Sequence, residues 1–433
     1  MCASVTFVDY RRRETIRTGG ARDGAGRQER DPGDAGVTDR ALPLAGVRVL
    51  DLSRVLAGPY CSMVLADLGA DVVKVERPGS GDPTRAWGPP FAEGESAYYL
   101  CVNRGKRSLS LDLGDPDGLA VARALALRAD IVLESFLPGG AGKLGLGYEE
   151  LAALHPELVY GSIAGYPADS PDADRPGFDF AIQAEGGIMS VTGEASGPPM
   201  KVGVAITDIT AGMFCTIGVL AALRQRELTG QGRHVEVSLF DSQLAWLANR
   251  GSEVLIAGEE PIRLGNAHPT IVPYEAFATS DGKWVIVAVG TDEQFRRFCL
   301  EAGLEGLAAD PRFTTNPQRV AHRVEIVEAL TRAIAGRTLA ESLAAIQRAR
   351  VPGGAVRSIA EVFGHAPFAI RSHDHPTIGT VRTVRSPIGL DGRHPTASAA
   401  PPLLGQHSEE VLAELGYGGA RLAELLAGPC STA

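Results

Sequence analysis

The alternation of buried strands and helices between residues 47 and 166 constrains the fold of this chain more than any other feature. Strand patterns are expected at residues 47–52 and 71–76, and the apolar helix between them ends near Gly69. A strand, a helix and a second strand in succession favour a parallel pair with a right-handed crossover. The pattern repeats, with strands at 108–112, 130–136 and 158–166 and helices at 117–129 and 148–155. It predicts an α/β fold with a doubly wound sheet.

After Gly251 the pattern changes. Strands are predicted at residues 272–279 and 283–289, joined by a hairpin signal at residues 280–282. Helical patterns follow at 292–302, 317–335 and 339–349, then a strand at 379–384 and a last helix at 409–415. We therefore expect residues 42–228 to form the first part of a large domain, 229–250 a linker strand and helix, 251–355 a smaller α+β domain, and 356–433 a return to the large domain.

Residues 1–41 differ from the rest, because arginine, glycine and acidic residues mix there without apolar periodicity. They are predicted to be a disordered tail or the product of an over-long start. A transit peptide is the alternative, which the acidic residues Glu14, Asp23, Glu29 and Asp31 disfavour.

Composition excludes several functional classes. An apolar fraction of 44%, a charged fraction of 22% and a net charge of −10 are typical of a globular protein and give no reason to expect nucleic acid or membrane as a partner. No run of about 18 apolar residues is expected to span a bilayer. The six cysteines are scattered and the nine histidines lack metal-ligand spacing, so we expect a reduced, cytoplasmic protein without a bound metal.

The first strand-helix-strand unit does not carry a dinucleotide-binding loop. The loop before its helix reads Ser-Arg-Val-Leu-Ala-Gly and lacks the glycine spacing that admits a pyrophosphate. A Gly-x-Gly-x-x-Gly pattern at residues 140–145 comes too late in the domain, and Leu144 stands where a P-loop needs Ser or Thr. Nicotinamide, flavin and nucleoside triphosphate binding are therefore not expected.

Basic residues gather near three predicted strand ends. Lys74 and Arg77 form one group, the segment from Arg104 to Arg107 a second, and Lys143 a third. Because the carboxyl ends of parallel strands form the ligand crevice, Arg77 and Lys143 are expected to face one anionic ligand. Solvated surface charge is the alternative interpretation.

Asp208 is the strongest candidate for catalysis. It comes at the start of a long apolar helix, where free N–H groups and the helix dipole favour an ionised carboxylate. One interpretation is a helix cap, and the other is a carboxylate nucleophile that attacks an activated acyl carbonyl. Nearby glycines, including Gly186 and Gly187, allow close approach of a ligand to the backbone.

Several segments, taken in order, resemble a known family. They are LAGVRVLDLSRVLAGPYCSMVLADLGADVVKVERPGSGDPTR, YYLCVNRGKRSLSLDL, ADIVLESFLPGGAGKLGLGY, VGVAITDITAGM around Asp208, and PPLLGQHSEEVLAELGY. Together they resemble the family III CoA-transferases, a superfamily that includes formyl-CoA and carnitine CoA-transferases and α-methylacyl-CoA racemases. The resemblance covers about residues 42–418.

The resemblance implies a Rossmann-like large domain built from both chain ends, a smaller α+β domain and an interlocked homodimer. It implies that coenzyme A is a co-substrate rather than a tightly bound cofactor. The residues expected to bind it are Val55, Ala57, Arg77, Arg104, Arg107 and Lys143.

The implied mechanism uses Asp208 as the nucleophile. Asp208 attacks the donor thioester to give a mixed anhydride, the CoA thiolate returns to form an aspartyl-CoA thioester, and an acceptor carboxylate then takes over the CoA through a second anhydride. Backbone N–H groups, including those of Gly186 and Gly187, are candidates for stabilising the oxyanions.

Phe178 separates the two branches of the superfamily. Racemases carry a Gly-His-Asp motif whose histidine exchanges a proton, whereas this chain has Gly177-Phe178-Asp179. CoA transfer is therefore expected, with the dicarboxylate branch of succinyl-CoA:glutarate type as the nearest match. Racemisation and non-catalytic CoA binding are the alternatives. Candidates for the substrate pocket are Phe178, Asp179, Gly186, Gly187, Arg263 and His268, with Arg175 as a further candidate for binding a carboxylate.

Overall fold

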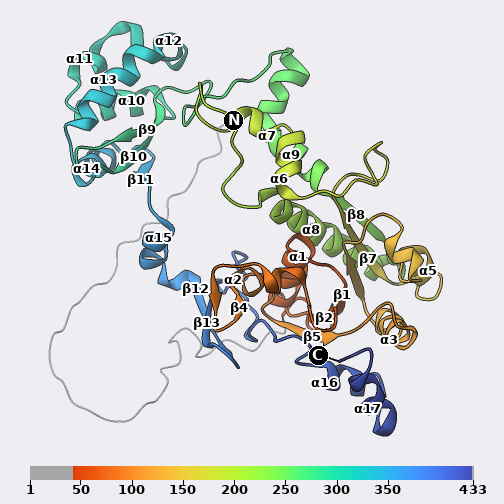
Figure 1. The fold of residues 1–433 in the computed structure, drawn as a ribbon. Helices are drawn as coiled ribbons and strands as arrows, with labels where there is room; N and C mark the ends of the chain where they lie inside the picture. Colours follow the sequence, from red (N-terminus) through yellow and green to blue (C-terminus); the bar gives the residue numbers. More distant parts are fainter. Residues whose placement is uncertain (1–41, 432–433) are drawn as a thin grey trace, which may run out of the picture. The chain divides into compact units, whose positions relative to one another are not determined.

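A six-stranded parallel sheet organises the chain (Figure 1). The computed structural model describes residues 42–431, so the tail predicted at residues 1–41 lies outside the described residues. The strand order is β5-β2-β1-β6-β7-β8, which confirms the predicted α/β fold. The strands are β1 (Arg48–Asp51), β2 (Asp71–Glu76), β5 (Lys106–Ser110), β6 (Ile131–Glu134), β7 (Val159–Ala164) and β8 (His234–Ser238).

Helices cover the sheet from both sides. On one face α1 (Ala57–Asp67) and α8 (Ile206–Thr229) share a core with Val72, Ile131 and Val159. On the other face α3 (Pro116–Ala126) and α5 (Tyr148–Ala152) share a core with Val75 and Val132. The strand order reverses between β1 and β6, so the loops that follow these two strands diverge. Such a switch point is where doubly wound sheets bind ligands.

The long helix α8 corrects one prediction. By length and composition it is apolar enough to cross a membrane, so the expectation that no such segment exists is wrong. Half of its apolar window is buried, however. A Cβ atom added to Gly161 of β7 would lie 3.1 Å from Sγ of Cys215 and 3.4 Å from Val219, so helix and strand are in close contact there. Within the described residues α8 is therefore a core helix of the sheet.

The C-terminal part of the chain returns to the first sheet. It contains β12 (Ile370–His375), which pairs with β13 (Gly379–Val384), followed by α16 (Ser408–Glu414) and α17 (Gly419–Ala427). Val411 and Leu412 of α16 are buried in the same core as α3 and β2. The backbone N–H of Gly105 donates to the carbonyl of Ala399 at 3.0 Å.

A second hydrophobic core lies between residues 272 and 351. Its antiparallel sheet has the order β11 (Gly353–Ala355), β10 (Trp284–Ala288) and β9 (Tyr274–Ala278), and the predicted hairpin joins β9 to β10. Around it lie α10 (Asp292–Glu301), α11 (Glu305–Ala309), η3 (Pro311–Phe313), α12 (Asn316–Ala321), α13 (Arg323–Ala335) and α14 (Leu339–Ala349).

The remaining elements are short apart from α9. They are η1 (Pro83–Ala86), β3 (Phe91–Ala92), β4 (Glu95–Ser96), α2 (Ala97–Leu100), α4 (Gly140–Lys143), α6 (Asp179–Glu185), α7 (Ile188–Val191), α9 (Leu239–Ser252), η2 (Glu253–Ala257), α15 (Ile359–His365) and η4 (Pro367–Ala369).

Candidate active site

Asp208 lies in the first turn of α8, as the sequence predicted. Desolvation, and secondly the negative charge of Asp179, together raise the pKa of its carboxyl group from 3.8 to about 7. Among residues 42–431 no ion pair neutralises Asp208. Desolvation and the like charge of Asp179 therefore oppose the ionised form that the helix start was expected to favour.

Asp179 is fixed in place by the start of the same helix. It is the first residue of α6, and its Oδ1 accepts hydrogen bonds from the backbone N–H of Thr207 at 2.9 Å and from the Thr207 hydroxyl at 2.8 Å. The amide of Gln183, one turn further along α6, donates to Oδ2 at 2.8 Å. Asp179 thus connects α6 to the turn that carries Asp208.

The loop that follows β1 approaches the helical face that carries Asp208. A Cβ atom added to Gly212, one turn after Asp208, would lie 2.5 Å from the carbonyl oxygen of Ala57. A small apolar cluster also brings Val55 and Leu56 together with Ala205 and Ile209, which flank Asp208. Val55 and Ala57, both predicted to bind CoA, are therefore close to the candidate nucleophile.

Tyr98 belongs to the same cluster and was not found from the sequence. Its ring packs edge-on against Trp87, with centroids 5.2 Å apart. Burial raises the pKa of Tyr98 to about 12, and the next cause is the charge of Asp208. The hydroxyl group therefore remains protonated and can donate a hydrogen bond near Asp208. The capping serine Ser96, which starts the short helix α2, is the local sequence signal that marks this segment.

Exposed cations surround the loop after β1. Arg77 directly follows β2 and Lys143 ends α4, which follows β6, so they lie on the two sides of β1 in the sheet. Arg54, which sequence reasoning passed over, lies in the loop itself and places its guanidinium group 5.6 Å from the Phe136 ring centroid. Within the described range, none of these three side chains makes an ion pair.

The other basic residues predicted at this edge are paired elsewhere. Arg104 forms a buried ion pair with Asp67 at 2.5 Å. Arg107 binds Asp71 at the opposite end of β2, and also Glu410 and Glu414 of α16. Since their guanidinium groups are occupied, the geometry gives no support to a CoA-binding role for Arg104 and Arg107.

The substrate-pocket candidates fall into two groups. Phe178 precedes α6 beside Asp179 and is 63% exposed. By contrast, the N–H groups of Gly186 and Gly187 donate to carbonyls of α6, so they are not free to stabilise an oxyanion. Arg263 donates to the carbonyl of Gly197 at 2.8 Å, and the ring nitrogen Nδ1 of His268 accepts from the N–H of Thr270 at 3.2 Å. Arg175 pairs with Asp172 and Glu185 at the surface.

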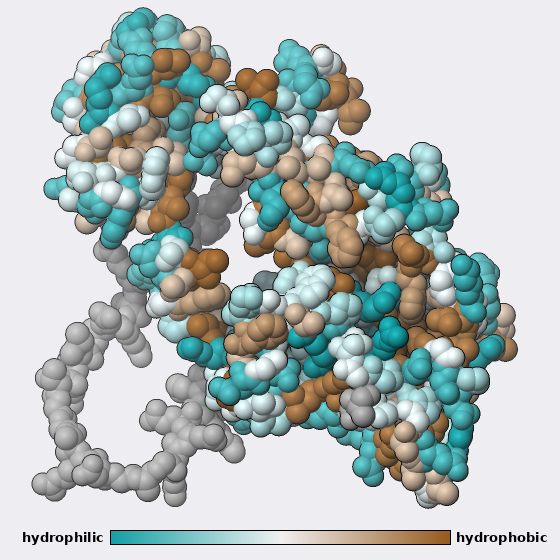
Figure 2. Space-filling view, viewed as in Figure 1, coloured by the Kyte–Doolittle hydropathy of each residue, from teal (hydrophilic) through white to brown (hydrophobic). Residues whose placement is uncertain are grey.

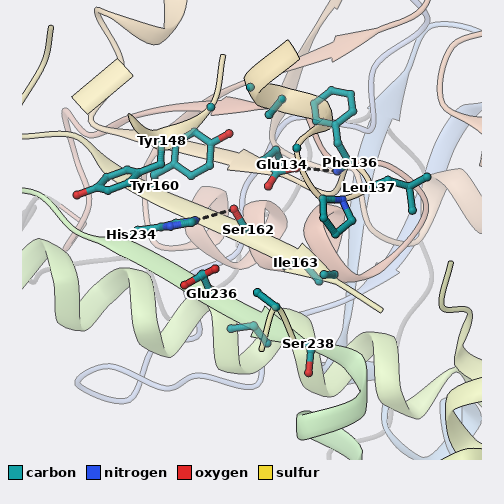
Figure 3. Close-up of a pocket in the computed structure, with 18 of the residues that line it drawn as sticks. Glu134, Phe136, Leu137, Tyr148, Tyr160, Ser162, Ile163, His234, Glu236 and Ser238 are labelled. Atoms are coloured by element: carbon teal, nitrogen blue, oxygen red, sulfur yellow. Dashed lines mark hydrogen bonds between the residues drawn. The ribbon is translucent and has the colours of Figure 1, made fainter. Parts of the chain in front are cut away.

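A cavity is lined by residues of β6, β7 and β8 and of the segments that follow β6 and β7 (Figure 3). It has a volume of about 740 Å³, and its labelled lining includes Glu134, Ser162, His234 and Glu236. Ser162 and Nε2 of His234 are 2.9 Å apart. The lining contains several carboxylates and no lysine or arginine, so this cavity does not suit the phosphates of CoA. No group of residues able to hold a metal ion occurs in the described part of the chain.

Comparison with known proteins identifies the family. The family model described as CoA-transferase family III matches residues 44–408. The succinate–glutarate CoA-transferase of Agrobacterium fabrum is 45% identical over 387 residues, which cover 87% of this chain and 96% of that protein. The human succinyl-CoA:glutarate CoA-transferase is 38% identical, with 89% of each chain covered. A crystal structure of a CAIB/BAIF family protein from Brucella suis matches with a TM-score of 0.78 and 40% identity, covering 87% of this chain and all of that chain.

The fold is doubly wound α/β, it carries a partly buried carboxylate beside the switch-point loop, and the family match extends over most of the chain. The chain belongs to CoA-transferase family III and is an enzyme that uses a CoA thioester as co-substrate.

Proposed function

We propose that this enzyme moves CoA from succinyl-CoA to a free dicarboxylic acid of the glutarate type. Relatives named for succinyl-CoA and glutarate, at 38–45% identity over most of the chain, support this choice of substrates. The observation that carries the proposal is the position of Asp208, which lies partly buried in the first turn of α8 close to Val55 and Ala57.

In the proposed reaction an oxygen of ionised Asp208 attacks the thioester carbonyl carbon of succinyl-CoA. The C–S bond breaks, which gives a mixed anhydride and the CoA thiolate. The thiolate then attacks the Asp208 carbonyl carbon and releases succinate, leaving an aspartyl-CoA thioester. The acceptor carboxylate repeats both steps in reverse order, so every stage keeps an activated acyl bond.

The N-terminus of α1 and the Tyr98 hydroxyl supply the donors for the oxyanions in this proposal. Ala57 and Gly58 begin α1, and no partner for their N–H groups occurs among residues 42–431. Donors held in place before the reaction stabilise developing charge without reorganisation. Arg54, Arg77 and Lys143 are the proposed contacts for the CoA phosphates.

Phe178 argues against the racemase alternative. It occupies the position before Asp179 at which a racemase needs a residue that exchanges a proton, and a phenyl ring cannot do so. A racemase would exchange the α-proton of an acyl-CoA in deuterated water without an acceptor acid, and we expect no such exchange.

The functional unit in this proposal is an interlocked homodimer with a large domain from both chain ends and a smaller domain. Large apolar side chains are exposed on adjacent elements, among them Phe214 and Ile217 of α8, Trp246 of α9 and Leu255 of η2. Figure 2 shows apolar surface where α8 and α9 lie in Figure 1. Several exposed large apolar side chains on neighbouring elements favour burial of this surface against a second copy. Light scattering of the purified protein at micromolar concentration tests this, and a monomer would contradict it.

The activity is tested with succinyl-CoA and a panel of free carboxylic acids, read by product mass. We expect glutarate or a similar dicarboxylate to be converted and Asp208→Ala to lose turnover by at least about a thousandfold. Hydroxylamine added during turnover should leave a hydroxamate on Asp208. Full activity of Asp208→Ala would contradict the mechanism, while CoA binding without any covalent adduct would indicate the non-catalytic alternative.

A further inference from the structure

Val55 has an unusual backbone conformation for its residue type. Its φ is +70°, in the left-handed region that a β-branched residue seldom adopts. Such conformations persist where the surrounding structure imposes them, and they gather at functional sites. The question is which residues of this chain impose it.

Asp82 holds the turn from one side. The backbone N–H of Val55 points at the Asp82 carboxylate, 3.4 Å from Oδ1 and 3.2 Å from Oδ2. Asp82 is itself held, because its Oδ1 accepts the N–H of Thr84 at 2.9 Å and the Thr84 hydroxyl at 2.7 Å. Asp82 and Thr84 are both buried, so this acceptor cannot shift toward solvent.

Lys74 holds the turn from the other side. Its Nζ is 3.0 Å from Oδ2 of Asp82 and donates to the carbonyl oxygen of Ser53 at 2.8 Å. One ammonium group therefore fixes both the carboxylate that receives the Val55 N–H and the carbonyl two residues before Val55. The Lys74 side chain is fully buried, so its ammonium group acts on the loop and not on solvent or on a ligand at the surface.

Both partners remain charged at neutral pH. Burial alone would neutralise them, but the Lys74 charge and the Thr84 N–H bring the pKa of Asp82 below its ordinary value. Burial likewise opposes the charge of Lys74, and the carboxylates of Asp82 and Asp51 nevertheless raise its pKa. A buried charged pair with further hydrogen bonds fixes geometry more strongly than a neutral pair would.

We propose that Asp82 and Lys74 form a clamp that keeps Val55 in its left-handed turn and thereby positions the 53–57 loop for the thioester end of CoA. They are positioning residues, since neither reaches the reacting atoms. This inference rests on the proposed function, in which the loop binds acyl-CoA beside Asp208. Asp82 and Lys74 are both buried and do not contact the ligand, yet in this proposal they contribute to the binding of acyl-CoA.

The test compares Asp82→Asn with Asp130→Asn. Asp130 is the control. Like Asp82 it pairs with a basic side chain, here Arg226 at 3.0 Å, and accepts a backbone N–H, that of Arg48, but it lies at the far end of β6. We expect Asp82→Asn to weaken binding of CoA, measured by calorimetry with CoA alone, by about tenfold and to raise the KM for succinyl-CoA similarly. The KM for the acceptor acid should not change, and Asp130→Asn should change neither constant.

Val55→Gly shows whether the backbone strain at Val55 causes the loss of CoA affinity in Asp82→Asn. Glycine adopts positive φ without a Cβ penalty, so the loss caused by Asp82→Asn should be about threefold smaller in a Val55→Gly background. If Asp82→Asn does not fold, Thr84→Val removes one hydrogen bond to Asp82 with little change of shape and should weaken CoA binding by about threefold.

Two outcomes overturn the clamp. One is unchanged CoA affinity in both Asp82→Asn and Thr84→Val, and the other is an equal loss in the Asp130→Asn control. Failure of the proposed function has a different signature, because the unaltered enzyme would then bind CoA yet transfer it to no acid. The affinity for CoA alone tests the clamp in either case.

Discussion

Asp179 and Thr207 are joined by two hydrogen bonds, one from the backbone N–H at 2.9 Å and one from the hydroxyl at 2.8 Å, both to Oδ1 of Asp179. This pair of bonds holds a negative charge beside the residue that follows Thr207, which is Asp208. The same contact thus sets the orientation of the first turn of α8 and, through its charge, helps to raise the pKa of the proposed nucleophile.

The first prediction concerns pH. Because the attacking form of Asp208 is ionised and its pKa is about 7, kcat/KM for succinyl-CoA should rise as the pH increases through about 7. In Asp179→Asn the amide oxygen can still accept hydrogen bonds from Thr207, but the negative charge beside Asp208 is removed. The midpoint of the pH profile of kcat/KM should therefore move to lower pH, by a few tenths of a unit to about one unit. An unchanged or higher midpoint in that variant would show that Asp179 does not act on Asp208.

The second prediction concerns the stability of the folded protein, which depends on pH because the pKa of Asp208 is raised. Folding raises the pKa of Asp208 from 3.8 to about 7, so the folded state favours the protonated form and loses stability as the pH rises through that range. A shift of about three units corresponds to about 4 kcal/mol at most. Asp208→Asn should therefore be inactive but more stable than the unaltered protein at pH 8, by a few degrees in thermal midpoint, with little difference at pH 4. Equal midpoints at pH 8 would be inconsistent with an Asp208 whose pKa is raised by desolvation and by the charge of Asp179.

Local patterns in the sequence were sufficient to predict most strands of the parallel sheet. The bounds predicted for β2, β13 and α14 coincide with those in the structure. The strand β5 begins two residues earlier than predicted, because Lys106 is buried in it and pairs with Asp51. The apolar pattern cannot reveal a lysine of this kind, since its partner lies 55 residues away.

The site was predictable only where its chemistry is local. Asp208 at a helix start and Arg77 after a strand follow from their neighbours in the sequence. The turn at Val55 contradicts the backbone preference of valine and depends on Asp82, 27 residues further on, so no local rule could find it. The pairing of Arg104 with Asp67 is likewise a long-range contact, which explains why a group of basic residues was taken for a ligand site.

The third prediction distinguishes the exposed cations Arg77 and Lys143, which make no ion pair within the described residues, from Arg107, which is held in ion pairs. Arg77→Ala and Lys143→Ala should each raise the KM for succinyl-CoA by about three- to tenfold, and the effect should shrink at high ionic strength. Arg107→Ala, which removes an exposed pairing network at the other end of β2, should leave this KM unchanged. If Arg107→Ala raised the KM as strongly as Arg77→Ala, the assignment of the CoA phosphates to the switch-point edge would be incorrect.

The last prediction concerns Tyr98, whose hydroxyl group lies close enough to Asp208 for the carboxylate charge to raise its pKa. Tyr98→Phe keeps the ring that packs against Trp87 and removes only the donor, so the fold of this segment should be retained. Loss of one donor to an oxyanion commonly costs about a hundredfold in rate, and a partly exposed tyrosine should cost about ten- to a hundredfold. The loss should appear in kcat, with the KM for succinyl-CoA changed by less than about threefold, because the developing negative charge is present only in the transition state.

Rapid mixing of succinyl-CoA with enzyme in the absence of acceptor measures formation of the aspartyl-CoA thioester directly. A Tyr98→Phe enzyme that forms this thioester at the original rate would remove Tyr98 from the catalytic residues and leave the N-terminus of α1 as the remaining candidate for the oxyanion donors.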